Sequence, residues 1–101
     1  MSVKKPKISV LIPVHNGADT LAETVASILN QTFADFELLL FDDASTDASP
    51  EIINSFADSR IRRFRSDANL GISEARNRLM ELAEGEYLAV MDLSLIHISE
   101  P

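Results

Sequence analysis

Three stretches of this chain are apolar almost without interruption and have the length of β-strands: residues 8–14, 36–41 and 87–91. A strand that faces water on one side alternates apolar and polar residues, whereas a strand buried on both sides does not. The unbroken runs therefore predict a mainly parallel sheet that is covered on both faces. Pro13 has no N–H group to donate, so pairing along the first strand is expected to stop there.

The segments between these runs have helical periodicity. Apolar residues recur at the spacing of one helix face in three segments: 21–29, 52–56 and 72–83. Ser49 followed by Pro50 is typical of a helix start, and Gly85 lies where a glycine commonly follows a helix end. A weaker strand is predicted at residues 60–65. Strands and helices then alternate along the chain, which is the order of the α/β fold class.

Composition excludes several kinds of protein. The 101 residues suffice for one small domain, and without cysteine there is no disulfide, thiolate metal site or cysteine nucleophile. Sixteen acidic and nine basic residues give a net charge of −7, which argues against nucleic acid or an anionic membrane surface as partners. No apolar run approaches the ~18 residues of a membrane span and no signal peptide is recognisable, so a cytoplasmic protein is expected.

The basic residues are concentrated in one place. Four arginines fall within six residues: Arg60, Arg62, Arg63 and Arg65. Such a cluster could hold a phosphate, but at strand spacing a solvated face on a sheet edge is the favoured interpretation.

Polar residues follow three of the predicted strands directly: His15 and Asn16, Asp42 and Asp43, and Asp92. Right-handed crossovers bring the carboxyl ends of parallel strands to one edge of the sheet, where ligands bind in folds of this type. A carboxylate there can accept hydrogen bonds from a base or a ribose, or help to hold a hard cation. The competing interpretation is that these aspartates only favour a turn. Neither a glycine-rich phosphate loop nor a G-x-S-x-G nucleophile motif is present, so a hydrolytic triad is not expected.

Five segments together resemble the N-terminal half of glycosyltransferase family 2: residues 8–16, 27–33, 36–47, 69–77 and 83–92. The resemblance covers residues 7–92 in order and with the spacing of that family. It implies a Rossmann-like GT-A fold that is incomplete in this chain. Residues 1–92 would then be the N-terminal, donor-binding part of the domain, which holds a nucleotide-sugar.

The resemblance also implies which residues surround the nucleotide: Pro13, Val14, His15, Asp42, Asp43, Gly71, Arg76 and Asn77. The first three would line a uracil pocket with backbone groups. Asp43 would hydrogen-bond the base, and Asp42 would support the turn that carries it. Arg76 could meet the diphosphate with its permanently charged guanidinium. The alternative for Arg76 is an ion pair with Glu74 or Glu81 on the surface of a helix.

In the family, the position of Asp92 opens a D-x-D motif at which Mg²⁺ or Mn²⁺ bridges the diphosphate of the donor. Here Ser94 stands in place of the second acid, and serine is a poor ligand for a hard cation. The expected general base lies beyond this sequence, so no catalytic residue is assigned and the 101 residues alone are expected to be inactive. Residues 93–101 do not match the family pattern and are expected to be a foreign tail, the alternative being a natural fifth strand at residues 93–98.

The longer parent is therefore expected to be an inverting glycosyltransferase of cell-surface polysaccharide synthesis. Its donor would be a nucleotide-sugar, most often a UDP-sugar, and its acceptor a glycan or a lipid-linked sugar. It would work in the cytoplasm, with the inner membrane surface as a further site for the parent.

Two non-catalytic alternatives stay open. A receiver-like signalling module would use Asp42, Asp43 and Asp92 as a metal and phosphoryl site. Its acid pair should follow the first strand, however, and no lysine occurs after Lys7. An acidic interaction module would use no small-molecule site at all.

Overall fold

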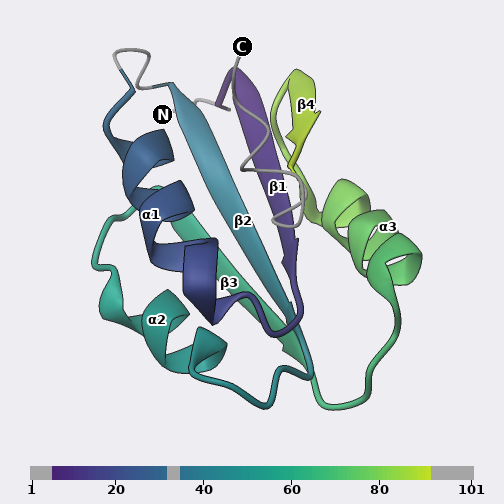
Figure 1. Ribbon diagram of the computed structural model, residues 1–101. Coiled ribbons are helices and arrows are strands. Elements are labelled where there is room, and N and C mark those ends of the chain that lie inside the picture. Colours follow the sequence, from purple (N-terminus) through teal and green to yellow (C-terminus); the bar gives the residue numbers. More distant parts are fainter. Residues whose placement is uncertain (1–5, 32–34, 92–101) are drawn as a thin grey trace, which may run out of the picture.

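The computed structural model describes residues 6–31 and 35–91 (Figure 1). The elements follow in the order β1 (Ile8–Val14), α1 (Ala18–Leu29), β2 (Phe36–Asp43), α2 (Ser49–Ser55), β3 (Ile61–Ser66), α3 (Ile72–Leu82) and β4 (Tyr87–Val90). The four strands are parallel and lie in the order β3-β2-β1-β4. The predicted α/β, Rossmann-like sheet is confirmed, with every predicted helix and strand in place.

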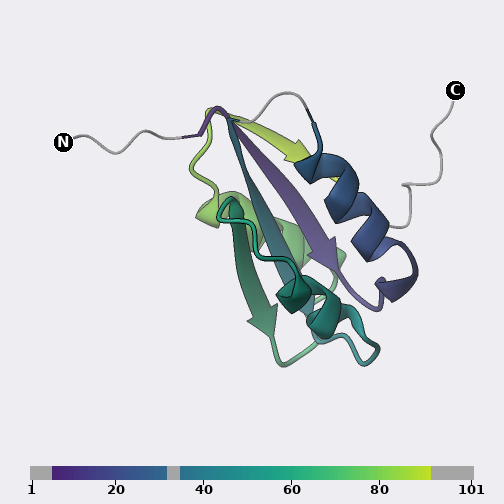
Figure 2. The ribbon, with the colours of Figure 1, turned by 90° about the vertical axis from the view of Figure 1, so that its left-hand side faces the viewer.

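Helices cover both faces of the sheet, as predicted. Helices α1 and α2 lie on one face and α3 lies on the other (Figure 2). Alternate residues of β2 explain why its sequence is apolar throughout. Leu38 and Leu40 belong to the core under α1 and α2, whereas Leu39 and Phe41 pack with Ala75 and Leu79 beneath α3.

The prediction that β4 is buried like the other apolar strands was wrong. All four of its residues are exposed, and Tyr87 retains 60% of its accessible surface. The reason is its position, since β4 pairs only with β1 and forms the outer edge of the described sheet. An apolar strand on an open edge is what a partial domain leaves behind.

The effect of Pro13 is limited to one side of its strand. Pairing of β1 with β2 continues through Pro13 to Val14, opposite Asp42. The carbonyl of Leu11 accepts a hydrogen bond from Met91 on the β4 side (2.9 Å). The backbone N–H and C=O groups of alternate residues point to the same side of a strand, so residue 13, like Leu11, directs its backbone groups towards β4. The N–H that Pro13 lacks would therefore face β4. The last described pair of β1 and β4 is Leu11 with Val90, so the missing donor affects neither this pairing nor the pairing with β2.

The four arginines lie at an edge strand of the described sheet, as expected, and Arg63 and Arg65 are exposed to solvent; three of the four also bind helix ends. Three of them each donate a hydrogen bond to a carbonyl near the C-terminus of a different helix. The pairs are Arg60 Nη2 with Leu29 of α1 (3.4 Å), Arg63 Nε with Ile53 of α2 (3.1 Å) and Arg62 Nη1 with Leu82 of α3 (2.9 Å). None of the three helices has a basic residue in its own last turn. Strand β3 thus supplies the positive charge that helix C-termini favour.

A buried carboxylate joins the turn between α3 and β4 to the sheet. Glu37 accepts hydrogen bonds from Ser9 Oγ (2.6 Å), from the backbone N–H of Glu84 (2.7 Å) and from Arg62 Nη1 (3.0 Å). Burial acts to raise the pKa of Glu37, but these hydrogen bonds outweigh it and lower the pKa below its usual 4.5. The carboxylate is therefore charged and fully partnered inside the fold.

Gly85 has a different role from the helix-ending glycine that the sequence suggested. Helix α3 ends at Leu82, and Ala83 caps it in an extended conformation. Gly85 instead packs directly on β1, where its N–H donates to Ser9 Oγ (2.7 Å). A Cβ atom at this position would lie 2.7 Å from the backbone nitrogen of Ser9, so close packing is what requires glycine.

We predict that Gly85→Ala destabilises the fold by about 1–3 kcal/mol, because the new methyl group meets backbone atoms that cannot move aside. Urea unfolding followed by circular dichroism measures the change. Glu86→Ala, in the same turn but at an exposed position, serves as the control and should change the free energy of unfolding by less than about 0.5 kcal/mol. Equal stability of the two variants would contradict the packing argument.

We also predict that the protein loses stability in acid as carboxylates with lowered pKa values, Glu37 and Asp58 among them, become protonated. Hydrogen bonds from Arg60 lower the pKa of Asp58 from 3.8 to about 2, and the pKa of Glu37 is lowered from 4.5. A carboxylate with a depressed folded-state pKa stabilises the fold above its unfolded pKa and loses that contribution as the pH falls through the folded value. The free energy of unfolding should therefore fall from pH 4.5 towards about 2.

Urea titrations across this pH range test the acid prediction, together with NMR titration of the side-chain carboxyl carbons. Asp58→Asn should reduce the pH dependence below 3.8 without abolishing the part due to Glu37. An Asp58 carboxyl that titrates at its usual pKa would show that its ion pair with Arg60 does not form in solution.

Candidate functional site

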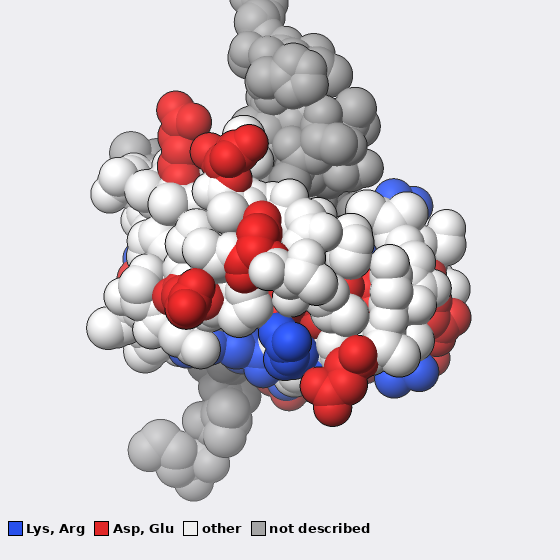
Figure 3. Space-filling model, turned by 60° about the horizontal axis from the view of Figure 1, so that its bottom comes forward, with Lys and Arg blue, Asp and Glu red and all other residues white. Residues whose placement is uncertain are grey.

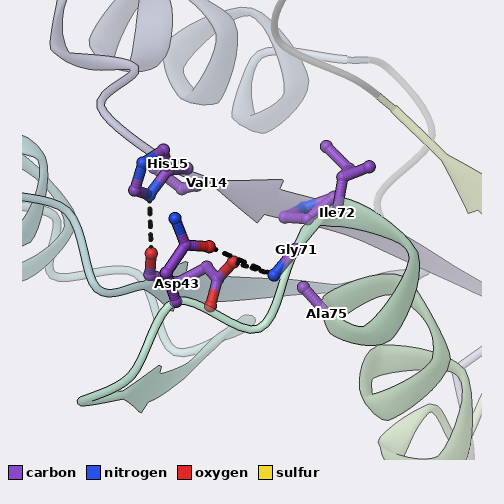
Figure 4. A pocket seen from close by; sticks show the side chains of 8 residues that line it. Val14, His15, Asp43, Gly71, Ile72 and Ala75 are labelled. Atoms are coloured by element: carbon purple, nitrogen blue, oxygen red, sulfur yellow. Dashed lines mark hydrogen bonds between the residues drawn. The ribbon is translucent and has the colours of Figure 1, made fainter.

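A pocket of about 320 Å³ opens at the carboxyl edge of the sheet, between the ends of β1 and β2 and the start of α3 (Figure 4). Eight residues line it: Pro13, Val14, His15, Asp43, Asn69, Gly71, Ile72 and Ala75. Five of them are among the eight residues that the sequence placed around a nucleotide. The structure therefore brings together Pro13, Val14, His15, Asp43 and Gly71, and adds three neighbours that the sequence did not single out.

Asp43 joins the end of β2 to the start of α3. Its Oδ1 accepts a hydrogen bond from the backbone N–H of Leu70 (2.7 Å), and its Oδ2 accepts one from the N–H of Gly71 (2.9 Å). The residue is 2% exposed. Strand alternation turns Asp43 towards the α3 face, where Figure 4 shows its carboxylate beside Gly71.

Gly71 is required by the backbone at the start of α3. Its φ of +91° and ψ of 156° lie in a region that residues with a side chain rarely adopt. No atom lies within 4 Å of the position that a Cβ would take, so the requirement comes from the backbone angle rather than from crowding. This conformation directs the N–H of Gly71 to Asp43.

His15 lies at the pocket wall and contacts the neighbouring strand. Its Nδ1 is 2.6 Å from the carbonyl oxygen of Asp43. A carbonyl only accepts hydrogen bonds, so Nδ1 carries the hydrogen and the neutral ring keeps Nε2 as an acceptor. This bond holds the ring in place at the mouth of the pocket (Figure 4).

A set of loop contacts, which the sequence analysis missed, holds the turn of His15 in place. Asn16, in a left-handed conformation with φ of 52°, accepts through Oδ1 from the N–H groups of Thr46 (2.8 Å) and Asp47 (3.3 Å). Ser45 Oγ accepts in return from the N–H of Asn16 (2.8 Å). The turn after β1 and the loop after β2 are thereby joined into one unit.

The same loop caps helix α1. Asp47 Oδ2 accepts from the N–H of Ala18 (3.1 Å), and Ser49 Oγ accepts from the N–H of Gly17 (3.0 Å). Hydrogen bonds from Ser49 lower the pKa of Asp47 below its usual 3.8. The polar composition of the loop was a signal for capping, but the helix it caps precedes it by about thirty residues, which a local pattern does not reveal.

Asp42 does not line this pocket. It is the neighbour of Asp43 on β2, so its side chain lies on the opposite face of the sheet. There it accepts a hydrogen bond from the N–H of Ser45 (3.2 Å) and forms an ion pair with Arg65. The carboxylate is 3% exposed and is engaged within the protein.

Arg76 and Asn77 lie on α3 outside the pocket lining. The expected alternative for Arg76, an ion pair with Glu74 or Glu81, is not found among the described residues. Glu74 pairs instead with Arg78 (3.3 Å). The Nε atom of Arg76 is buried and has no hydrogen-bond partner among the described residues. Asn77 is exposed to solvent.

The face around the carboxyl ends of the strands has no single dominant charge. Figure 3 shows acidic side chains scattered over a mostly uncharged surface, with basic side chains in small groups. Within residues 6–31 and 35–91, no three His, Asp or Glu residues lie together as metal ligands would. The predicted metal residue Asp92, with Ser94 and the rest of residues 93–101, lies outside the described part of the chain. None of the described helices is both long and apolar enough to cross a membrane.

Comparison with known proteins identifies many relatives of this chain. It is 42% identical over 89 residues to a glycosyltransferase of Haemophilus influenzae, covering 86% of this chain and 36% of that protein. It is 39% identical over 85 residues to a UDP-Glc:alpha-D-GlcNAc-diphosphoundecaprenol beta-1,3-glucosyltransferase of Escherichia coli, covering 84% of this chain and 34% of that protein. The chain thus spans about a third of the length of these relatives.

Solved structures share the fold. TarS 1–349 of S. aureus in complex with UDP-GlcNAc superimposes with a TM-score of 0.81 at 28% identity, over 86% of this chain and 26% of that one. A mannosyltransferase of Pyrobaculum calidifontis, in complex with GDP-Man and Mn²⁺, gives a TM-score of 0.79 at 24% identity, over 89% of this chain and 28% of that one. Both are much longer than the part that matches.

The family model described as glycosyl transferase family 2 matches residues 9–97, which is most of the sequence. The resemblance seen in five sequence segments is therefore confirmed by an independent match. Sequence and fold lead to one conclusion: this chain belongs to glycosyltransferase family 2.

Proposed function

We propose that the pocket binds the nucleoside of a UDP-sugar, as part of a longer enzyme that transfers the sugar to an acceptor. The observation that carries the proposal is Asp43, a buried carboxylate that faces the pocket and already holds the start of α3. Relatives support it, since one is named as a UDP-Glc-dependent glucosyltransferase and TarS was solved with UDP-GlcNAc. A volume of about 320 Å³ suits a base and part of a ribose better than a whole nucleotide-sugar.

The chemistry of Asp43 favours uracil over cytosine. An ionised carboxylate only accepts hydrogen bonds, and each oxygen of Asp43 has taken one backbone N–H and can accept another. Uracil presents an N–H at N3, whereas cytosine presents a lone pair there. At this position cytosine would place its N3 lone pair, a hydrogen-bond acceptor, against a carboxylate oxygen of Asp43, which is also an acceptor. The exposed side chain of Ile72 offers an apolar surface for one face of the ring.

The remaining assigned residues complete the proposal for the longer enzyme. Asp42 supports the turn after β2, and Arg76 with Asn77 would lie towards the diphosphate. Burial of the unpartnered Arg76 Nε is consistent with a guanidinium whose anionic partner comes from outside the described residues. Residues 1–92 would form the donor-binding part; the tail proposed at residues 93–101 overlaps the family match, which extends to residue 97.

Transfer itself requires groups that the described residues do not supply. Mg²⁺ or Mn²⁺ at Asp92 is proposed from the family resemblance, and when bound it would neutralise the charge of the leaving diphosphate. An acceptor hydroxyl would attack the anomeric carbon with inversion, after losing its proton to a carboxylate further along the longer chain. We place this reaction in the cytoplasm at the membrane surface, because the E. coli relative is named for a diphosphoundecaprenol-linked acceptor.

The receiver-like alternative is disfavoured by the directions of the two aspartates. Asp42 and Asp43 lie on opposite faces of the sheet and hold different partners, Arg65 and the start of α3. Two carboxylates arranged in this way cannot share one cation or act on one phosphoryl group.

We predict that UDP binds the 101-residue chain weakly, at millimolar concentration, and shifts the NMR signals of residues that line the pocket. Asp43→Asn should weaken binding at least about tenfold, because its amide group would replace one of the acceptor oxygens and oppose the donors around it. Ile72→Ala, at an exposed wall position, should weaken binding a few-fold without affecting the core. CDP should bind more weakly than UDP.

The matched control is Asp67→Asn, which makes the same chemical change at a fully exposed aspartate outside the pocket. It should leave UDP affinity unchanged. Circular dichroism establishes that each variant is folded before it is titrated. If UDP produces no shifts at the pocket, or if Asp43→Asn and Ile72→Ala bind it as the unmodified chain does, the proposed nucleotide site is wrong.

A further inference from the structure

We propose that Glu37 is a positioning residue for the nucleotide pocket, acting from the far end of helix α3. The inference rests on the proposed function of that pocket. The Glu37 carboxylate is buried and lies more than half the length of β2 away from the pocket. It forms no hydrogen bond with the described residues that line the pocket. Its basis is that a single strand, β2, holds both ends of α3 through two carboxylates.

The two ends of α3 are held in the same manner. At the N-terminal end, Asp43 accepts from the N–H groups of Leu70 and Gly71. At the C-terminal end, Glu37 accepts from the N–H of Glu84 at 2.7 Å. In both places a carboxylate of β2 binds backbone N–H groups just outside the helix.

The lengths of strand and helix are compatible with this arrangement. Glu37 and Asp43 are six residues apart on the same face of β2, which corresponds to about 20 Å along a strand. Helix α3 is eleven residues long, or about 16 Å at the rise of an α-helix, and the non-helical residues at each of its ends span the rest of the way to the two carboxylates. The two carboxylates thus hold the segments that flank α3 at opposite ends of β2.

The apolar contacts between these ends do not fix the helix by themselves. Leu39 and Phe41 of β2 pack against Ala75 and Leu79 of α3. Such contacts are non-directional, so they tolerate small rotations and shifts of a helix on a sheet. Hydrogen bonds to charged acceptors are directional and short, and they define where each end of the helix lies.

Glu37 is connected to more than one part of the fold. Ser9 Oγ donates to it (2.6 Å) and itself accepts from the N–H of Gly85 (2.7 Å). Arg62 Nη1 donates both to Glu37 (3.0 Å) and to the last carbonyl of α3, on Leu82 (2.9 Å). Strands β1, β2 and β3 thus meet the end of α3 at one buried charge.

Loss of that charge would release one end of the helix while the other stays held. In Glu37→Gln, an amide donor faces groups that are themselves donors, and at least one of Ser9, Glu84 and Arg62 loses its acceptor. The C-terminal end of α3 would then move about the contact with Asp43 as a pivot. Ile72 and Ala75, which form one wall of the pocket, would move with it.

The test compares Glu37→Gln with Ile53→Val in the full chain. Ile53 lies in the core under α1 and α2, on the other face of the sheet, so its shortening lowers stability without touching α3. The first measurement is the NMR signals and hydrogen exchange of Gly71, Ile72 and Ala75 in the folded variants, without nucleotide. The second is the affinity for UDP.

We expect Glu37→Gln to shift the amide signals of Ile72 and Ala75 while the N–H of Gly71 stays bound to Asp43, and to weaken UDP binding roughly three- to tenfold. Ile53→Val should leave both readouts as in the unmodified chain. Should Glu37→Gln fail to fold, Ser9→Ala removes a single donor and should shift the same amides to a smaller extent. Pocket amides that are unchanged in a folded Glu37→Gln or Ser9→Ala variant, or that shift equally in Ile53→Val, would overturn the proposal.

The two measurements separate this proposal from the one on which it rests. If the unmodified chain binds no UDP, the proposed function fails, yet the amide signals still report whether Glu37 positions α3. If UDP binds and the amides move in Glu37→Gln without any change in affinity, Glu37 holds the helix but does not position the pocket, and the inference is wrong.

Discussion

The arrangement of this fold depends on the alternation of side chains along β2. All eight of its residues are buried, so each face of the strand must be complementary to a different layer. On one face the apolar residues support α1 and α2, and on the other they support α3. The same alternation separates the adjacent residues Asp42 and Asp43, sending one to the arginine of β3 and the other to the pocket. A shift of one residue in register would exchange all these roles at once.

Charge is distributed along the sheet according to the direction of its strands. At the end where the strands begin, arginines from the β3 region donate to the carbonyls that the three helices leave unpaired. At the end where the strands stop, carboxylates and hydroxyls accept from N–H groups near the starts of α1 and α3. Each set of side chains matches the partial charge of the helix ends it meets. The pocket lies at the end that carries acceptors, which suits a ligand with N–H or O–H groups to donate.

Much of this could be predicted from the sequence, for a physical reason. Strand and helix positions are local patterns, and parallel topology then places His15 and Asp43 at one edge of the sheet, whereas Pro13, Val14 and Gly71 were expected there only from the family resemblance. The contacts that the sequence did not reveal join residues far apart in the chain: Asn16 with Thr46, Arg62 with Leu82, and Gly85 with Ser9. Gly85 is an example. Its place in the sequence suggested the end of a helix, but the reason that glycine is required there is close packing against Ser9 of β1, which is 76 residues away in the chain.

The proposed function assigns recognition of the donor and transfer of its sugar to different parts of the longer enzyme. Among the described residues, those that line the pocket lie between Pro13 and Ala75, at the ends of β1 and β2 and the start of α3. These elements form the covered part of the sheet, where burial fixes Asp43 and a hydrogen bond to the Asp43 carbonyl holds the exposed His15. The exposed strand β4 comes later and contributes nothing to the lining. In the proposed function, the described residues supply the nucleoside pocket within a segment that spans about a third of these relatives, and transfer of the sugar would depend on parts of the longer enzyme outside them.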